Sequence, residues 1–321
     1  MFSSRSVGAL PPPRFRASPP PRAGGGGSLA ERAAAKRRAA EQDSSDDPRT
    51  KLNSPARWLL LGVSLVFLGC IIVVPFLTVF VTFVQNGWRP FVRTLHEPEF
   101  QHACLLTFAL SLVAVPVNAF FGTVAAMVLS RPHVPLRNVI LALLDLPFAV
   151  SPVIVGLAFV LLYGRGGLLA PLLERFGLHV VFAFPGMLLA TMFVTIPFVV
   201  KEVLPMLEGE DAYDEQAALT LGGTNPVVFW RVTLPNIRWG LLYGIILSNA
   251  RAMGEFGAVS VLSGNIVGHT QTLTLYVETA YKEYNAEAAF VAAVLLAILS
   301  LITLYLKGKI EDAVAEEGAE H

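Results

Sequence analysis

The chain has 321 residues, of which 54% are hydrophobic and 15% are charged, and its mean hydropathy is +0.59. A soluble globular domain carries about a quarter charged residues, so this composition excludes a purely water-soluble protein and predicts that lipid is part of its solvent. The 24 basic and 24 acidic residues cancel, which excludes a global positive field for nucleic acid.

Residues 1–50 differ in composition from the rest of the chain. They are rich in Pro, Gly, Ser and Arg, with no acidic residue before Glu31. Such a segment buries too little apolar surface to become ordered, and it lacks the apolar core of about 7–15 residues of a secretory signal. An Arg- and Ser-rich leader with few acidic residues is typical of a chloroplast or other organelle transit peptide, which is the preferred interpretation. A disordered cytoplasmic tail of a bacterial protein is the alternative.

Six apolar runs of about 20 residues follow the leader and predict an all-α integral membrane protein of about six transmembrane helices. Lipid offers no partner for a free backbone amide or carbonyl, so runs of this length are expected to be helical. They form a membrane domain at 51–310, and a short polar tail follows at 311–321. The runs are 58–84, 103–130, 138–163, 181–200, 239–262 and 286–306.

The basic residues of the short loops predict the orientation, because inner loops carry an excess of Lys and Arg. Six spans place both termini on one side, together with the long loop at 201–238. More basic residues fall on that side than on the other, so we expect it to be the inner side. The inner residues are Lys51, Arg57, Arg131, Arg137, Lys201, Arg231, Arg238, Lys307 and Lys309, and the outer residues are Arg89, Arg93, Arg165, Arg175 and Lys282.

The third apolar run contains helix-breaking residues. Asp145 precedes Pro147 and Pro152 in the stretch LLDLPFAVSPVIVGL. Proline removes a backbone donor and interrupts the helical hydrogen-bond ladder. Transporters use broken helices to present backbone dipoles to substrates, so a break in this span is expected.

The long inner loop at 201–238 carries a polar cassette between two apolar runs, and its pattern predicts a helix, a turn and a second helix. Asp211 or Asp214 is expected to cap the first helix, whose first turn carries Glu215 near the positive end of the helix dipole. The double glycine at 222–223 then ends this helix, because a left-handed C-terminal turn favours glycine.

The second helix of the cassette is predicted to be apolar. Thr224 is positioned to cap it, with Pro226 in its first turn. The side chains at 227–230 follow, until Pro235 marks the approach to the next span. An apolar patch outside the lipid usually marks a protein contact. The alternative is an ordinary loop whose apolar side packs on its own spans, and the residues alone favour neither.

The cassette resembles the cytoplasmic EAA loop of ABC importer permeases. It has two alanines, a glycine after three further residues, a valine after nine more, and then Leu-Pro. In that family the loop forms a coupling helix that docks in a groove of the ATPase subunit. The family's glutamate falls on a glutamine here, which keeps the length and acceptor oxygen but loses the charge. The coupling residues that this resemblance implies are Glu215, Gln216, Ala217, Ala218, Gly222, Val232, Leu234 and Pro235.

The resemblance extends over nearly all of the chain after residue 55. Further segments look like the sulfate/thiosulfate permease subunit of the W type, and molybdate and tungstate permeases are near relatives. With its leader, the chain is similar to the plastid sulfate permeases of green algae. The segments are 143–157, 193–205, 230–244, 249–266 and 284–307.

The resemblance implies a non-catalytic permease with the fold of type I ABC importers. Such a subunit would move sulfate, or thiosulfate, across the chloroplast inner envelope; the bacterial inner membrane is the alternative location. The implied partners are a sulfate-type ATPase, a T-type permease subunit that forms a heterodimer with this chain, a sulfate-binding protein and membrane lipid. Two rivals are a molybdate or tungstate permease, and a membrane assembly or scaffold protein without transport activity.

The sequence lacks the motifs of catalytic and nucleotide-binding proteins, as expected of a non-catalytic subunit. The chain has no G-x-x-x-x-G-K-[ST] phosphate loop, so ATP is expected on the separate ATPase and no cofactor is expected to bind directly. No metal-ligand cluster and no catalytic motif is present either.

Charged residues inside the spans are the remaining candidates, because a charge in the membrane is costly. Arg251 and Glu255 are four residues apart, which places them on one helical face. Either Arg251 helps a dianion through the pore while Glu255 holds it, or the two form a neutral pair that fixes helix packing. The second is preferred, since a neutral pair attracts sulfate weakly. Gly254 and Gly257 would let helices approach closely, and Asp145, which would repel sulfate, is expected to be a cap or packing partner.

Overall fold

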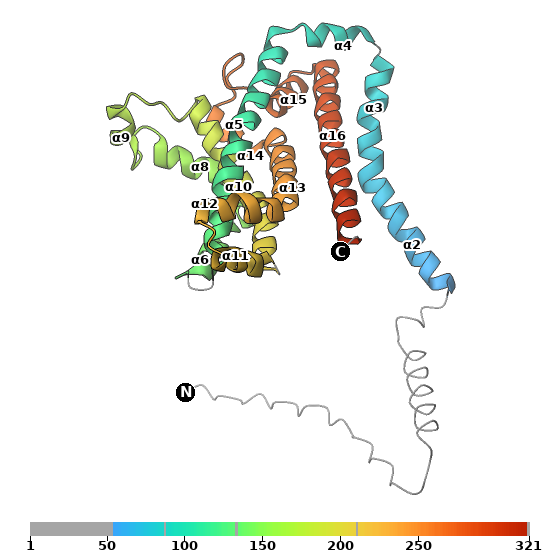
Figure 1. Cartoon of the computed structure of the whole chain (residues 1–321). Helices are drawn as coiled ribbons and strands as arrows, with labels where there is room; N and C mark the ends of the chain where they lie inside the picture. The colour runs from blue at the N-terminus through green and yellow to red at the C-terminus, as the bar shows by residue number, and fades with distance from the viewer. Residues whose placement is uncertain (1–53, 87, 132–133, 210, 320–321) are drawn as a thin grey trace, which may run out of the picture. The chain divides into compact units, whose positions relative to one another are not determined.

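The computed structural model describes residues 54–319 except 87, 132–133 and 210, and all regular elements in these ranges are helical (Figure 1). The predicted transit peptide at 1–50 lies outside the described residues. The chain divides into two compact units, of which the first ends at Ile71 and the second begins at Ile72.

The first span consists of α2 (Ser54–Leu68), the π-helical turn η1 (Gly69–Val73) and α3 (Val74–Asn86). In its apolar stretch Trp58–Gln85, no residue of the most hydrophobic window is buried within the chain. Trp, Leu, Val and Phe side chains are exposed along most of α2. Such exposure is expected of a helix that lipid or another protein covers.

Four helices in the part of the chain that the structure describes are long and apolar enough to cross a membrane. They are the first span, α5 (Pro98–Leu129), α10 (Phe184–Glu208) and residues 286–310 of α16 (Ala286–Ala319). Because α10 continues eight residues beyond the predicted end at 200, the prediction that Lys201 belongs to the inner loop is wrong. The helix tolerates this charge because an ion-pair partner compensates it.

The third predicted span is broken, as its prolines indicated. It consists of α6 (Arg137–Leu144), α7 (Leu146–Ala149) and α8 (Pro152–Tyr163). Pro147 and Pro152 each stand in the first turn of a new helix, where a missing N–H costs no hydrogen bond.

The fifth predicted span is also broken, and here the prediction of one helix over 239–262 is wrong. It forms α13 (Leu234–Met253) and α14 (Gly257–Ser263). The carboxylate of Glu255 accepts a hydrogen bond from the backbone N–H of Ala258, at 3.1 Å. This side-chain partner replaces a helical one, so the backbone can leave helical geometry inside the apolar run.

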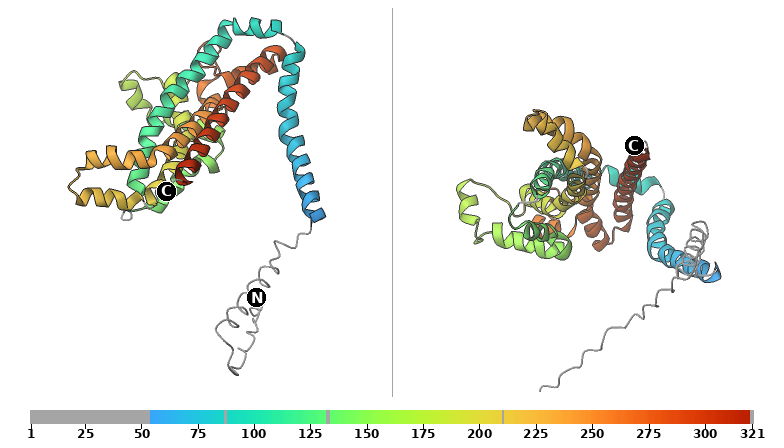
Figure 2. Two further views of the ribbon diagram at one scale, coloured as in Figure 1. Left: turned by 45° about the vertical axis from the view of Figure 1, so that its right-hand side comes forward. Right: turned by 60° about the horizontal axis from the view of Figure 1, so that its bottom comes forward.

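Shorter helices lie at the two ends of the second unit. In Figure 1, α4 (Trp88–Leu95) and α15 (Leu273–Lys282) lie at one end, which we call the α15 end, and α9 (Ala170–Arg175) lies to one side of α8. The opposite end carries α11 (Asp211–Thr220), followed by α12 (Asn225–Val228) and the π-helical turn η2 (Phe229–Thr233). Figure 2 shows α11 and the α12–η2 helix projecting together from the body as an arm. We call residues 211–233 the arm and this end the arm end.

Glycines set the distance between α10 and α13. The sequence GLLYG places Gly240 and Gly244 one helical turn apart on α13. A Cβ at Gly240 would lie 2.7 Å from the carbonyl oxygen of Glu202, and one at Gly244 would lie 3.0 Å from the Cα of Val199. This small-x-x-x-small pattern allows the two backbones to touch, as is common between membrane helices.

Two further contacts complete the packing of the spans. Asn118 on α5 is fully buried, and its Nδ2 donates to the carbonyl of Met192 and to the hydroxyl of Thr195 on α10. The half-helices α8 and α14 touch at Gly257, where a Cβ would lie 2.8 Å from the Cβ of Pro152. The two broken spans are therefore packed against each other.

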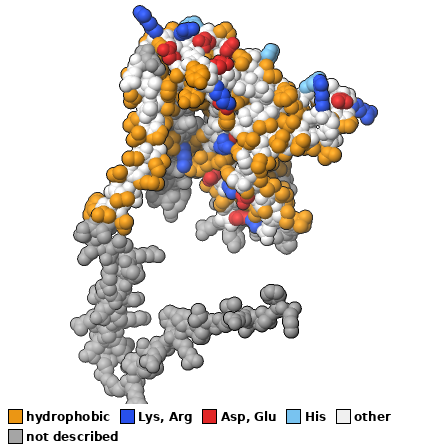
Figure 3. Space-filling view, turned by 180° about the vertical axis from the view of Figure 1, so that it is seen from behind, with side chains coloured by type: hydrophobic (Ala, Val, Ile, Leu, Met, Phe, Trp, Pro, Cys, Tyr) orange, Lys and Arg blue, Asp and Glu red, His pale blue; other side chains and the backbone are white. Residues whose placement is uncertain are grey.

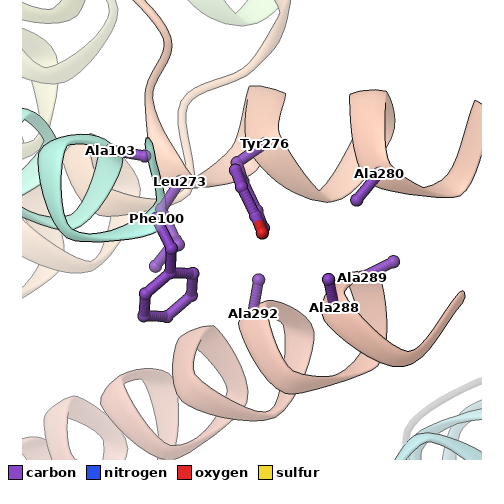
Figure 4. Close-up of a cluster of buried hydrophobic side chains, with 8 residues drawn as sticks. All are labelled: Phe100, Ala103, Leu273, Tyr276, Ala280, Ala288, Ala289 and Ala292. Carbon is purple, nitrogen blue, oxygen red and sulfur yellow. The ribbon is translucent and has the colours of Figure 1, made fainter. Parts of the chain in front are cut away.

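A hydrophobic cluster joins α5, α15 and the start of α16 at the α15 end (Figure 4). Tyr276 lies at its centre, with its ring edge-on to Phe100 at a centroid distance of 5.5 Å. The Tyr276 hydroxyl donates to Glu97 at 2.8 Å, and burial raises the pKa of this tyrosine, so the hydroxyl keeps its proton. Alanines on α15 and α16 let the helices approach: Ala280, Ala288, Ala289 and Ala292.

Candidate functional site

The first helix of the arm ends as the sequence predicts. Gly222 has a φ of +91°, which favours glycine. The N–H of Gly223 donates to the carbonyl of Ala218, and that of Gly222 to the carbonyl of Leu219. This pair of bonds is a Schellman motif.

The start of this helix differs in part from the prediction. α11 begins at Asp211, so Asp214 lies within the helix and does not cap it. The side chain of Asp211 lies outside the described residues. Thr224 stands at the cap position of α12 with extended backbone, but its side chain makes no capping hydrogen bond.

The second helix of the arm continues into the fifth span without a non-helical residue between them. α12, η2 and α13 follow one another with no residue between them. Pro235 lies in the first turn of α13, where it cannot donate to the residue four positions earlier. The wider π-helical turn of η2 precedes this missing bond, as π-turns do when they relieve strain in a helix. The second helix of the arm and α13 thus form one continuous run of helical residues.

The arm presents apolar side chains outward. Leu221 is 89% exposed and Trp230 is 66% exposed, while Leu219 and Val227 are also exposed. Val228, in contrast, is buried, and a Cβ on Gly223 would lie 2.9 Å from it. The arm therefore folds around Val228 and leaves an apolar surface that its own spans do not cover.

Glu215 attaches the arm to the rest of the chain. Its carboxylate lies 3.6 Å from the guanidinium of Arg131, just beyond α5, and accepts a hydrogen bond from Thr233 in η2 at 3.4 Å. Gln216, at the position of the family's glutamate, points to solvent. Glu215 therefore holds the arm to the rest of the chain, whereas the side chain of its neighbour Gln216 is exposed.

The other predicted coupling residues lie along the arm and in the first turn of α13. Ala217 and Pro235 are exposed, whereas Ala218, Val232 and Leu234 are partly buried. All eight predicted residues therefore fall within one contiguous helical hairpin.

The structure brings Arg251 and Glu255 together, but across a helix break. Arg251 Nη1 lies 2.8 Å from Glu255 Oε2. Glu255 is buried, and Thr274 of α15 donates to its carbonyl at 2.9 Å. The predicted role of Gly254 in close helix approach is wrong, because a Cβ there would meet only atoms of its own turn, at 3.6 Å or more.

Asp145 lies at the junction of α6 and α7 and pairs with Lys201 of α10. The Oδ1–Nζ distance is 2.5 Å. The ammonium also lies 4.5 Å from the ring centre of Phe148, within the range of a cation–π contact. Asp145 makes no side-chain capping hydrogen bond, and its ionic contact with α10 agrees with the other predicted role, that of a packing partner. Lys201 is the residue that sequence reasoning missed; the apolar pattern that continues to Leu207 could have revealed it.

Among the described residues, no group of three or more His, Cys, Asp or Glu is arranged to hold a metal ion. The described residues thus offer an exposed apolar surface on the arm and two ion pairs on the long helices and their junctions.

Comparisons with known proteins place these features in context. The family model described as "Binding-protein-dependent transport system inner membrane component" matches residues 118–315, which include the arm and both ion pairs. The chain is 59% identical over 259 residues to "Sulfate permease 2, chloroplastic" of Chlamydomonas reinhardtii, covering 81% of this chain and 70% of the relative. It is 48% identical over 263 residues to "Sulfate transport system permease protein CysW" of Synechocystis sp., covering 82% and 95%.

A solved structure has the same fold. A chain of a bacterial alginate ABC transporter, in complex with an alginate pentasaccharide-bound periplasmic protein, matches with a TM-score of 0.66. The match covers 80% of this chain and 94% of that chain at 17% sequence identity. At this identity the likeness concerns the fold alone, which is that of a type I ABC importer permease.

Proposed function

Because the chain belongs to the binding-protein-dependent transport system inner membrane components, and within them to the sulfate permeases of the W type, we propose that it forms part of the membrane pathway of an ATP-driven sulfate importer. It is a non-catalytic permease subunit, and ATP hydrolysis takes place on a separate subunit. The observation that carries this proposal is the 48–59% identity to sulfate permeases over about four fifths of the chain.

Sulfate uptake tests the substrate. Membrane vesicles that hold the chain with its partner subunits should accumulate radiolabelled sulfate in the presence of ATP, and excess unlabelled sulfate should abolish the signal. Molybdate or tungstate should compete only weakly. Stronger competition by either of these anions than by sulfate would assign the chain to the other oxyanion.

We infer that the arm is the contact for the ATPase. Its outward apolar residues, Leu221 and Trp230 among them, are unusual outside the lipid. The helix that carries Trp230 continues into α13, so movement of the arm moves a span. The coupling role of Glu215, Gln216 and the other arm residues follows from this arrangement together with the family.

Replacement of Trp230 by alanine tests the contact. Exposed tryptophans at interface centres carry large shares of binding energy, so Trp230→Ala should reduce co-purification of the ATPase by about tenfold or more. Trp88→Ala is the matched control, because Trp88 is similarly exposed on α4 at the α15 end. Equal co-purification from both variants would contradict the assignment. Loss of the ATPase with unchanged sulfate uptake would favour a scaffold role.

The remaining partners and the location follow from the same family. A T-type permease subunit would cover the exposed first span and complete the pathway as a heterodimer. A sulfate-binding protein would deliver sulfate at the α15 end, opposite the arm. The chain is an integral membrane protein of the chloroplast, in its inner envelope, and residues 1–50 act as the transit peptide that brings it there.

A further inference from the structure

Two ion pairs of the second unit lie at membrane depth. α10 has 25 residues and is therefore about 37 Å long, slightly more than the roughly 30 Å hydrocarbon core. Its middle falls at Ile196. Lys201 lies five residues further toward the arm end, or about 7 Å, which is well inside the hydrocarbon boundary.

The depth of Arg251 follows from the contact between α13 and α10. The two helices are antiparallel, since Gly240 meets Glu202 whereas Gly244 meets Val199. Arg251 is seven residues beyond Gly244, or about 10 Å toward the α15 end. It therefore lies within about 6 Å of the middle of the membrane and about 13 Å above Lys201 along α10.

These charged side chains are only partly covered by their own chain. Lys201 and Asp145 are 50% and 55% exposed, and Arg251 is 36% exposed. Figure 3 shows a few charged side chains along the apolar body as well as at its ends. At this depth an exposed charge cannot face hydrocarbon without a large free-energy cost. The exposed sides of both pairs must therefore face a water-filled pathway or another protein.

The Arg251–Glu255 pair is asymmetric in a way that favours an anion, whereas Lys201 and Asp145 are about equally exposed. The side chain of Glu255 is only 1% exposed, and its other oxygen is bonded to the Ala258 N–H. Arg251 is the accessible member, and within the described residues its guanidinium has this one ionic contact. Its five N–H donors leave several for a ligand. Lys201 has three donors and is held by Asp145 and the ring of Phe148.

We propose that Arg251 and Lys201 are two successive contacts for a tetrahedral dianion along the pathway, with Glu255 and Asp145 weakening each contact enough for the anion to leave. Conduction needs sites that bind well enough to attract an ion but weakly enough to release it. A free cation in a low-dielectric pore would hold a dianion too tightly, whereas a neutral pair with an accessible cation does not. The proposal rests on the proposed function and names the side chains that the substrate meets.

Substitutions at the second pair separate transport from packing. In the reconstituted full complex, Lys201→Gln should lower ATP-driven uptake of radiolabelled sulfate by about tenfold, the effect of one lost charge-assisted hydrogen bond. Asp145→Asn should tighten equilibrium binding of radiolabelled sulfate by about the same factor and slow its release. The double variant, which combines Lys201→Gln with Asp145→Asn, should keep the packing contact, because the two introduced amides can hydrogen-bond to each other, but should transport as poorly as Lys201→Gln.

The first pair should behave in parallel. Arg251→Gln should impair uptake. Glu255→Gln should tighten sulfate binding, because it removes the negative charge beside Arg251. The local fold should persist, because the glutamine oxygen can still accept the Ala258 N–H. Lys282→Gln is the matched control, because Lys282 pairs with Glu278 at 2.6 Å on α15, outside the membrane-crossing helices. Because the binding protein is proposed to act at the α15 end, this control is read as equilibrium binding of radiolabelled sulfate to the complex without the binding protein, which Lys282→Gln should leave unchanged.

Three outcomes would overturn the inference. Recovery of uptake in the Lys201→Gln/Asp145→Asn variant would make the pair a packing device. Loss of the second permease subunit from either lysine or arginine variant would make the exposed face a subunit contact. Unchanged uptake in both cation variants would exclude contact with the anion. A wild-type complex that transports no sulfate would instead refute the proposed function, so the two failures are distinguishable.

Discussion

Gly222 adopts a backbone conformation that other residues reach only with strain. Its φ is +91°, and a Cβ there would meet no atom within 4 Å. Replacement by alanine would therefore disturb the conformation of the turn and nothing else. This position allows the conformational contribution of one residue to be measured.

We predict that Gly222→Ala loosens the arm by about 1–2 kcal/mol, the cost of a left-handed residue with a side chain. The fraction of open arm should rise by about 5–30-fold, and limited proteolysis within 211–233 should speed up accordingly. Gly209→Ala is the matched control, since Gly209 has a negative φ and room for a Cβ at 3.5 Å. Equal cleavage rates in both variants would count against a strained turn.

Local chemistry explains which residues of the site were predictable. The turn at Gly222 depends on neighbours within five positions, and the motif that predicts it is written in one stretch of sequence. Glu215, in contrast, contacts Arg131 and Thr233, which are 84 and 18 positions away. The pairing of Asp145 with Lys201 likewise depends on how α10 lies beside the broken third span, which no local pattern contains.

At the scale of the elements, contact between α10 and α13 depends on two glycines without side chains. A Cβ on Gly244 would lie 3.0 Å from a backbone atom of Val199, which cannot rotate away. The helices must separate if this position gains a side chain.

Gly244→Val should destabilise the permease by about 1–3 kcal/mol, the usual cost of overpacking. The thermal midpoint of the purified complex in detergent should fall by about 2–4 °C for each kcal/mol. Gly308→Val is the control, because nothing lies within 4 Å of a Cβ at Gly308 on α16. An unchanged midpoint for Gly244→Val, or an equal fall for both variants, would contradict the role of the glycines.

The six apolar runs all fall on helices in the part of the chain that the structure describes, but their hydropathy did not predict where these helices are broken. Pro147 and Pro152 indicated the break in the third span, because proline acts through the backbone of its own helix. The break in the fifth span depends on a carboxylate that bonds a backbone N–H three residues later. Hydropathy alone does not predict this break, because the apolar run continues on both sides of it.

At the scale of the whole molecule, residues 1–50 differ from the membrane domain in every property that governs folding. The match to the permease family covers residues 118–315, which all follow the leader. The leader is therefore expected to be dispensable for assembly and needed for delivery.

Import into isolated chloroplasts tests this division. The full chain should be taken up, shortened at its N-terminus and recovered with the inner envelope, whereas a chain that begins at residue 51 should stay outside. Both forms should bind the ATPase equally in detergent, because the arm is unchanged. A full-length protein in the envelope would support the bacterial type of tail.

The π-helical turn that joins the arm to α13 has a mechanical consequence. Helical residues run without interruption from Asn225 to Met253, and the π-helical turn and Pro235 mark the place where such a helix bends most readily. The helix stops at Gly254, and α14 follows only through a short non-helical joint. If the ATPase contacts the arm, as proposed, a displacement there would reach Arg251 through α13, and the joint at Gly254 would let the half-helix beyond it keep its place.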